Sequence, residues 1–268
     1  MGKAGRIDGE WTDRSYLRTV QYADPGNLVA RQSIYAFQRP RIDLPAWALD
    51  LAGIRGVETV VDVGCGNGAY LAVLRRRGHD GSLIGVDLSE GMVRAVRQAA
   101  PVVEAVVGDA ASLPLTAGQA DVALAMHMLY HVPDPRAAVA ELRRVVRDGG
   151  RVLVVLNGRD HLRQLDAMLA PAGGVTQRTA PLSGLRLDEG VALLSSAFAR
   201  IERHEVRARL ELDAVGPVLD YVGSMGLVQS GELSMEDLAG FVTDYVEAEL
   251  GRAGAFVVDT HSGCLVCR

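Results

Sequence analysis

The stretch Asp62-Val63-Gly64-Cys65-Gly66-Asn67-Gly68 decides the fold, because it leads from a buried strand into a helix through three glycines. Thr59 to Val63 is an almost wholly apolar run, as expected of a strand that is covered on both faces. Tyr70 to Arg77, which follows the glycines, has the residue spacing of a helix. A strand that enters a helix through closely spaced glycines brings a ligand against bare backbone. We therefore expect a nucleotide-like ligand at this turn.

Outward from this turn, short β-branched runs alternate with helical segments. Strands are expected at residues 83–86, 102–107, 122–125 and 151–156, and helices at residues 91–99 and 135–146. This alternation is typical of βαβ units with right-handed crossovers and a parallel sheet. The sequence therefore predicts a doubly wound α/β fold.

The two ends of the chain differ from this pattern. Beyond Gly158 we expect helices at residues 161–169, 187–198, 217–225 and 235–250, and strands at residues 200–212 and 255–268. Residues 1–50 hold more than a third of the aromatic side chains, which predicts an N-terminal helical lid packed over the ligand crevice. The expected organisation is a lid at 1–50 and one α/β domain at 51–268, with an insertion around 159–198.

Composition limits the function. The net charge of −5 opposes a nucleic-acid partner, since such proteins usually carry a basic stripe. There is no apolar run of about 18 residues, which excludes a helical membrane span. The first eleven residues lack the apolar stretch of a secretory signal, so we expect a cytoplasmic protein. Cys264 and Cys267 have no second Cys or His pair at zinc spacing, and we expect them in a closing strand rather than at a metal.

The glycine turn alone does not identify the ligand. Glycine-rich turns between strand and helix occur in proteins that bind nicotinamide, flavin or S-adenosylmethionine. Gly64, Gly66 and Ala69 would also satisfy the dinucleotide pattern G-x-G-x-x-G/A. The decision therefore rests on the residues around the turn.

Three carboxylates favour S-adenosylmethionine. Asp62 precedes the glycines, where it would repel a pyrophosphate but suits the ammonium group of a methionine moiety. Asp87 ends the second strand and can accept hydrogen bonds from both ribose hydroxyls, a feature shared with NAD proteins. Asp109 follows the third strand, where a carboxylate can accept from the adenine amino group. A dinucleotide site has no standing need for an acid at that place.

Four motifs together carry a family resemblance. They are Asp62 to Gly68, Gly85-Val86-Asp87-Leu88-Ser89, Gly108-Asp109-Ala110 and Met128-Leu129-Tyr130-His131-Val132-Pro133-Asp134. In this order they resemble the motifs of class I S-adenosylmethionine-dependent methyltransferases. The similarity is closest to the small-molecule branch that includes ubiquinone/menaquinone methyltransferases and bacterial natural-product tailoring enzymes. Tyr22-Ala23-Asp24 and the final Cys-Arg look like a bacterial subgroup of that branch.

The resemblance implies a seven-stranded, mostly parallel sheet whose last strand is antiparallel. It also implies S-adenosyl-L-methionine as cofactor, S-adenosyl-L-homocysteine as product and no metal. The residues that it assigns to the donor are Asp62, Gly64, Gly66, Asn67 and Gly68 at the methionine part, Asp87 at the ribose, Leu88, Met92, Asp109 and Ala110 at the adenine, and Tyr22 and Arg31 over the carboxylate.

The acceptor is expected beyond the carboxyl ends of the strands, beside the donor. His127 and His131 follow the fourth strand at a spacing of four, so they would share one face of a short helical turn and offer a general base. The alternative is that one of them only anchors the loop to backbone. The side chains expected to contact the acceptor are Tyr16, Tyr35, Tyr130, Asn157 and His161.

These observations predict an enzyme that methylates carbon, oxygen or nitrogen of a small, largely apolar aromatic metabolite, such as an indole, a phenol or an amine, in bacterial secondary metabolism. A respiratory-quinone methyltransferase is the nearest alternative. A nicotinamide-dependent oxidoreductase and a non-catalytic S-adenosylmethionine-binding protein are more remote. The sequence leaves the oligomeric state open, and a homodimer is compatible with it.

Overall fold

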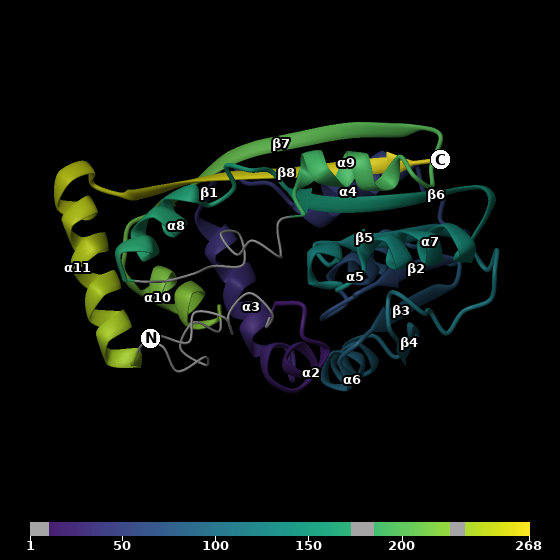
Figure 1. Ribbon diagram of the computed structural model, residues 1–268, viewed down its shortest axis with the longest axis horizontal. Coiled ribbons are helices and arrows are strands. Elements are labelled where there is room, and N and C mark those ends of the chain that lie inside the picture. Colours follow the sequence, from purple (N-terminus) through teal and green to yellow (C-terminus); the bar gives the residue numbers. More distant parts are fainter. Residues whose placement is uncertain (1–10, 173–184, 226–233) are drawn as a thin grey trace.

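The computed structural model describes residues 11–172, 185–225 and 234–268 (Figure 1). The chain folds around a single mixed sheet with helices on both of its faces. The strands lie in the order β1-β7-β8-β6-β5-β2-β3-β4. They are β1 (Gln38–Arg39), β2 (Val60–Val63), β3 (Leu83–Asp87), β4 (Glu104–Val107), β5 (Ala120–Met126), β6 (Val146–Asn157), β7 (Ile201–Leu212) and β8 (Phe256–Cys267).

The predicted fold class is confirmed. Strands β2 to β6 are parallel, and β8 pairs antiparallel with both β6 and β7. The expected count of seven strands is wrong by one, because residues Gln38 and Arg39 form an eighth strand on the outer edge of β7. A two-residue pairing has no period that a sequence pattern could reveal.

The boundary that differs most is the start of β6. The strand expected at residues 151–156 already begins at Val146, so Gly149 and Gly150 lie inside it, and the pairing of β5 with β6 shifts its register between Ala120 and Val122. Gly149 has a φ of 73°, so glycine lets the strand bend there without ending.

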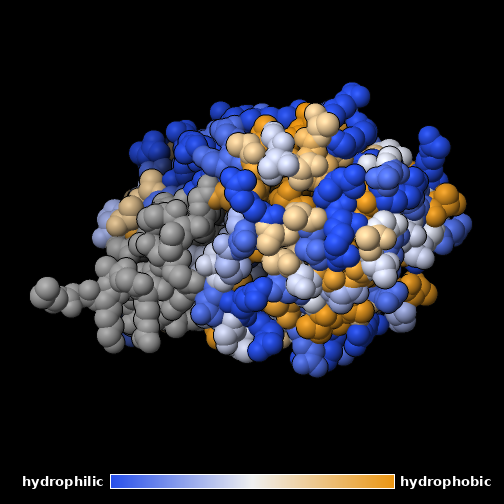
Figure 2. Space-filling view, turned by 45° about the vertical axis from the view of Figure 1, so that its right-hand side comes forward, coloured by the Kyte–Doolittle hydropathy of each residue, from blue (hydrophilic) through white to orange (hydrophobic). Residues whose placement is uncertain are grey.

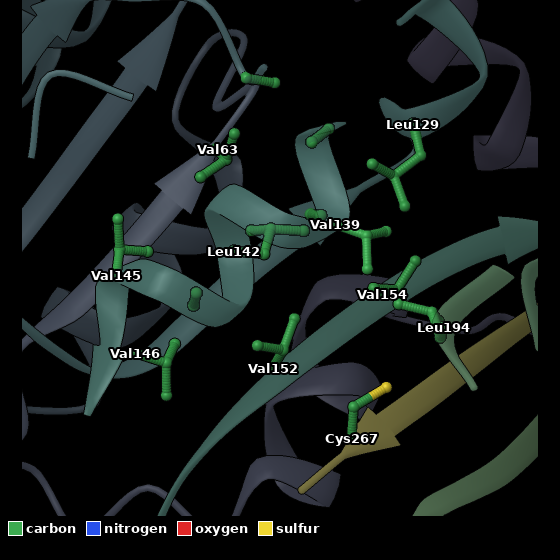
Figure 3. Close-up of a cluster of buried hydrophobic side chains, with 14 of the residues drawn as sticks. Val63, Leu129, Val139, Leu142, Val145, Val146, Val152, Val154, Leu194 and Cys267 are labelled. Atoms are coloured by element: carbon green, nitrogen blue, oxygen red, sulfur yellow. The ribbon is translucent and has the colours of Figure 1, made fainter. Parts of the chain in front are cut away.

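Helices cover the two sheet faces in two apolar clusters. On one face lie α7 (Pro135–Val145) and α9 (Leu187–Leu194), packed against Val63, Val152 and Val154 (Figure 3). On the other lie α4 (Leu44–Ala52), α5 (Ala69–Arg76) and α6 (Glu90–Ala99). Neighbouring residues of one strand belong to opposite clusters, as the alternation of side chains along a strand requires. Burial on both faces explains why β2, β5 and residues 152–156 of β6 are mostly apolar.

Capping residues set the starts of α6 and α7. Asp134 accepts hydrogen bonds from the backbone N–H groups of Arg136 and Ala137, and Pro135 takes the first position of α7. Ser89 accepts from the N–H of Met92 at the start of α6. Ser89 closely follows the end of β3, whereas Asp134 ends the longer loop after β5, so the two caps set where these loops pass into helices.

A third apolar cluster lies at one end of the molecule, where β7 and β8 extend past the other strands (Figure 1). It joins α8 (Arg163–Leu169), α10 (Gly216–Gly223) and α11 (Met235–Ala253) to the N-terminal segment, by which we mean residues 11–50. That segment contains α2 (Arg14–Tyr16), a π-helix (Leu17–Gln21), α3 (Gly26–Ser33) and a 3-10 helix (Ile34–Phe37). Its division from the rest of the chain as a separate lid stays a prediction.

The surface is mixed in character. Figure 2 shows apolar residues dispersed among polar ones over one face of the molecule. Single exposed apolar residues are usual for globular proteins. Within the described ranges, no helix is long and apolar enough to cross a membrane.

Candidate active site

A cavity of about 1150 Å³ lies at the carboxyl ends of β2, β3 and β5. The glycine turn, the loop after β5 and the N-terminal segment all contribute to its walls. Pockets for one small ligand usually measure roughly 300–1000 Å³. The cavity therefore has room for two molecules side by side, one against the glycine turn and one farther out.

The glycine turn has the backbone that only glycine adopts without strain. Gly64, Gly66 and Gly68 have φ values of 68°, 52° and 77°. A side chain at Gly64 would meet the Met128 side chain at 2.7 Å, and one at Gly66 would meet Leu28 at 2.9 Å. The turn is held in place by the Gly64 and Cys65 N–H groups, which both donate to the carbonyl of Val86. Asn67, at the rim, donates to the side-chain oxygen of Gln32 at 2.9 Å.

Two charged residues of the cavity wall have buried atoms with no partner among the described residues. Asp62 is 1% exposed, and neither of its carboxylate oxygens accepts a hydrogen bond. Burial, and then the negative charge of Asp87, raise the pKa of Asp62 to about 8. Arg31 stacks over the Tyr22 ring at 5.0 Å, while its Nη2 is buried and unpaired. Unpaired buried charge is costly, so this arrangement indicates a ligand carrying the two opposite charges.

Asp87 shapes the next part of the cavity. Its two oxygens accept hydrogen bonds from the N–H groups of Gly66 and Ser89, each at 2.8 Å. Burial raises the pKa of Asp87, and these backbone hydrogen bonds oppose that rise. The carboxylate thus ties the glycine turn to the start of α6, and its remaining lone pairs are available to a ligand. Leu88 and Met92 line the cavity beside it.

The N-terminal segment covers the cavity near Asp87 and the start of α6. Ser89 donates its hydroxyl proton to the Tyr22 carbonyl at 2.6 Å, and a side chain at Gly91 would overlap the Ala23 carbonyl. Asp109 accepts from the N–H of Ala111 and pairs with Arg14 of α2. Ala110 lies beside it in the cavity wall. Each of the three expected donor-site acids is therefore present at the cavity, and one of them already contacts the N-terminal segment.

The expected placing of the two histidines on one helical face is wrong. His127 has a φ of 56° just after β5, and only Leu129–His131 form a 3-10 turn. His127 donates its backbone N–H to the Val155 carbonyl, and burial lowers the pKa of its imidazole to about 4. The left-handed backbone turns His127 away from the helical relation that a spacing of four assumes.

His131 is held at both ring nitrogens. Its Nδ1 lies 3.0 Å from the carbonyl oxygen of Trp11, and its Nε2 lies 2.9 Å from the hydroxyl of Tyr22. Burial lowers the pKa of His131 to about 4, and the hydrogen bond with Trp11 opposes that fall. The histidine thus anchors the loop after β5 to the N-terminal segment. The Trp11 contact was missed in the sequence, because a backbone carbonyl has no residue-type signature.

Most of the side chains expected at the acceptor do line the cavity. Tyr35 and His161 contact each other at 3.0 Å, Tyr130 packs against His131, and Asn157 accepts from Ser262. Tyr16 is absent from the wall, and its hydroxyl donates to Gln21 at 3.4 Å instead. Other wall residues were not expected from the sequence, and they include Tyr70, Tyr221, Thr260 and Ser262. The last three come from α10 and β8, far from any motif.

Sequence comparisons agree with these features. A family model described as a methyltransferase domain matches residues 61–154. A trans-aconitate 2-methyltransferase of Azoarcus sp. (strain BH72) is 28% identical over 85% of this chain and 84% of its own length. An uncharacterized methyltransferase of Mycobacterium tuberculosis, Rv3342, is 29% identical over 65% of this chain and 67% of its own.

One relative is matched over a smaller share. An uncharacterized 37.1 kDa protein of transposon TN4556 from Streptomyces fradiae is 41% identical over 110 residues. These residues make up 40% of this chain and 32% of the relative, so the match spans about a third of that protein's length.

Solved structures share the fold. A protein of Bacillus halodurans C-125 assigned to the methyltransferases superposes with a TM-score of 0.62 and 19% identity, over 85% of this chain and 99% of its own. The 4+2 cyclase SpnF superposes with a TM-score of 0.55 and 19% identity, over 84% and 79%. Because the fold alone does not determine a reaction, the assignment rests on the motifs, the matched model and the relatives. Together they show that residues 61–154 form a methyltransferase domain, of the class I S-adenosylmethionine-dependent kind that the motifs resemble.

Proposed function

We propose that this protein transfers the methyl group of S-adenosylmethionine to a small, largely apolar aromatic metabolite, as a tailoring step of bacterial secondary metabolism. The observation that supports the donor is that the two Asp62 oxygens and the Arg31 Nη2, which have no hydrogen-bond partner among the described residues, belong to the wall of one cavity. The methionine part of the donor has one ammonium and one carboxylate, which match the two in charge. The ammonium would donate charge-assisted hydrogen bonds to Asp62, and the carboxylate would accept them from Arg31.

Other residues of the same cavity wall support the placing of the ribose and the adenine of the donor. Asp87 accepts from the ribose hydroxyls with its remaining lone pairs, and Leu88 and Met92 pack on the adenine. Asp109 accepts from the adenine amino group beside Arg14. In this pose the methyl group points into the outer half of the cavity, where alignment and exclusion of water drive a direct displacement.

The outer half supports an aromatic acceptor. Tyr22, Tyr35, Tyr130 and Tyr221 contribute rings to the walls, and rings favour stacking or edge contacts with a flat molecule. The relatives also support small-molecule acceptors, since they include a trans-aconitate 2-methyltransferase and a ubiquinone biosynthesis O-methyltransferase. A nicotinamide dinucleotide is disfavoured, because its pyrophosphate would face the Asp62 carboxylate.

Isothermal titration calorimetry tests the donor assignment. S-adenosylhomocysteine is expected to bind with a dissociation constant near micromolar, while NADH gives no heat of binding. The opposite pair of results would end the methyltransferase proposal. Methyl transfer is then followed with radiolabelled donor and a series of phenols, indoles and amines, and the absence of any transfer would leave only donor binding.

A further inference from the structure

The two hydrogen bonds of His131 determine where its proton lies. The Trp11 carbonyl can only accept, so the neutral imidazole carries its hydrogen on Nδ1. Its Nε2 is then an acceptor, and the Tyr22 hydroxyl, 2.9 Å away, must be the donor. The proton of Tyr22 therefore points at His131. With neither ring nitrogen open to a ligand, His131 acts on a bound molecule only through Tyr22.

Tyr22 is held at the junction of the two halves of the cavity. Its carbonyl accepts from Ser89, two residues after Asp87, and its ring lies under Arg31. Its hydroxyl reaches the loop after β5 at His131. Since the hydroxyl proton is engaged, the oxygen can only accept a hydrogen bond from a ligand beside it.

We propose that Tyr22 is the residue that touches the reacting atom of the methyl acceptor, that it passes the acceptor's proton to His131, and that the acceptor is a hydroxyl compound of phenol type. This rests on the proposed methyl transfer. The acceptor oxygen attacks the methyl carbon, the carbon–sulfur bond breaks, and its electron pair stays on the sulfur of the product thioether. The acceptor's proton goes to the Tyr22 oxygen while the Tyr22 proton goes to Nε2 of His131. The imidazolium, held by the Trp11 carbonyl, later releases one proton to water.

The chemistry of the base selects a hydroxyl over an alkyl amine. An oxygen that has gained a methyl group while still carrying its proton is strongly acidic, so even a weak base removes that proton. A methylated alkyl amine keeps its proton near neutral pH, and a carboxylate has none to lose. His131 is such a weak base, because burial depresses its pKa and the Arg31 charge depresses it further. The groups that face it are Tyr22, Tyr130, Arg31 and the Trp11 carbonyl.

In a second tyrosine and histidine pair of the same cavity, the hydrogen bond runs in the opposite direction, from the histidine to the tyrosine. The backbone N–H of His261 donates to Nδ1 of His161 at 3.0 Å, so neutral His161 carries its hydrogen on Nε2. That hydrogen points at the Tyr35 oxygen, 3.0 Å away. His161 has no lone pair with which to take a proton from Tyr35. Tyr35→Phe is therefore the matched control for Tyr22→Phe, since both remove one hydroxyl of a tyrosine and histidine pair.

The test compares catechol with the alkyl diamine 1,2-bis(aminomethyl)benzene as probe acceptors, with radiolabelled donor, between about pH 6 and about pH 10. The wild-type protein is expected to methylate catechol. Tyr22→Phe and His131→Gln should lose about 100-fold or more of kcat at neutral pH, a usual size for proton transfer by a side chain. The loss in Tyr22→Phe should shrink roughly tenfold per pH unit, because the phenolate forms without a base. Any loss in Tyr35→Phe should be the same at every pH.

Several outcomes would overturn the proposal. One is a Tyr22→Phe protein that keeps its catechol rate, and another is a loss that does not shrink as the pH rises. A parallel loss of S-adenosylhomocysteine affinity in Tyr22→Phe, measured by calorimetry, would make Tyr22 a donor-site residue, as the sequence predicted. A wild-type protein that binds the donor but methylates only the diamine, or neither probe, would refute the hydroxyl class. Failure of the wild-type protein to bind S-adenosylhomocysteine would instead refute the proposed function.

Discussion

At the scale of single residues, Asp62 stands apart because the folded chain provides nothing to offset the burial of its charge. Its pKa rises from an ordinary 3.8 to about 8, with burial as the main cause. Between these values the unfolded chain has released the proton while the folded chain still holds it. Stability contributed by this group is therefore present at low pH and is lost as the pH rises from about 4 to about 8. The site is built for a ligand at the expense of the ligand-free fold.

Replacing Asp62 by Asn should separate the effect of this carboxyl group on stability from its effect on ligand binding. Because one pKa unit corresponds to about 1.4 kcal/mol, the variant should be more stable than the wild type at pH 7 by as much as about 4 kcal/mol. The gain should vanish near pH 4, where the wild-type carboxyl is also neutral. Urea unfolding at both pH values measures it. In the same variant, S-adenosylhomocysteine should bind at least about tenfold more weakly, because the ammonium loses a charged partner.

A stability that is unchanged at both pH values would mean that Asp62 is not protonated in the free protein. Unchanged affinity would remove it from the donor site.

At this scale the sequence predicted where the three acids lie better than it predicted the surroundings of the histidines. Asp62, Asp87 and Asp109 follow strand ends at motif positions, so their side chains had to meet at one edge of the sheet. The partners of His131 could not be predicted in this way. The Trp11 carbonyl lies 120 residues away and belongs to the backbone, and the left-handed φ of His127 contradicts the helical spacing.

At the scale of elements, the long pair β7 and β8 depends on a cluster of charges that the sequence did not single out. His261 of β8 is buried, and its two ring nitrogens contact Asp160 and Glu205 at 2.5 and 2.6 Å. Burial raises the pKa of Asp160, but hydrogen bonds with His261 and Arg207 outweigh it and lower the pKa to about 2. Hydrogen bonds with His261 lead the causes that lower the pKa of Glu205.

Removing the imidazole should therefore weaken the protein against acid. A carboxylate with a lowered pKa contributes stability above its ordinary pKa and loses it as the pH falls toward the folded value. In His261→Gln, unfolding followed by circular dichroism should set in at a higher pH than in the wild type. His204→Gln on the neighbouring strand is the matched control, because that imidazole lies 3.9 Å from Glu202 and is 39% exposed. Equal shifts in the two variants would contradict the role given to His261.

Element boundaries show what could be read from a pattern and what could not. The helices over residues 69–76, 90–99 and 135–145 match their expected ranges closely, because apolar spacing and capping residues agree there. The strand β6 begins five residues early, since a glycine pair indicates a turn in sequence although the backbone continues in the sheet.

At the scale of the whole molecule, binding and stability should be linked, because the donor would contact residues from both the sheet and the N-terminal segment. Saturation at about 100 times the dissociation constant adds about 2.7 kcal/mol to the free energy of unfolding. For a chain of this size the expected rise in Tm is roughly 5–10 °C. Differential scanning fluorimetry with S-adenosylhomocysteine measures it, and NADH at the same concentration should give no rise.

The two-residue strand β1 links any movement of the N-terminal segment away from the cavity to the exposure of β7. Gln38 lines the cavity, and Gln38 and Arg39 pair with Leu210 and Arg209 at the outer edge of the sheet. If the segment lifts by this end to admit a ligand, it breaks the hydrogen bonds of β1 and uncovers the backbone of β7. An uncovered edge strand readily pairs with another molecule. Amide hydrogen exchange along β7 would then report how often the cavity opens, and a ligand that keeps it shut would also protect the protein from self-association.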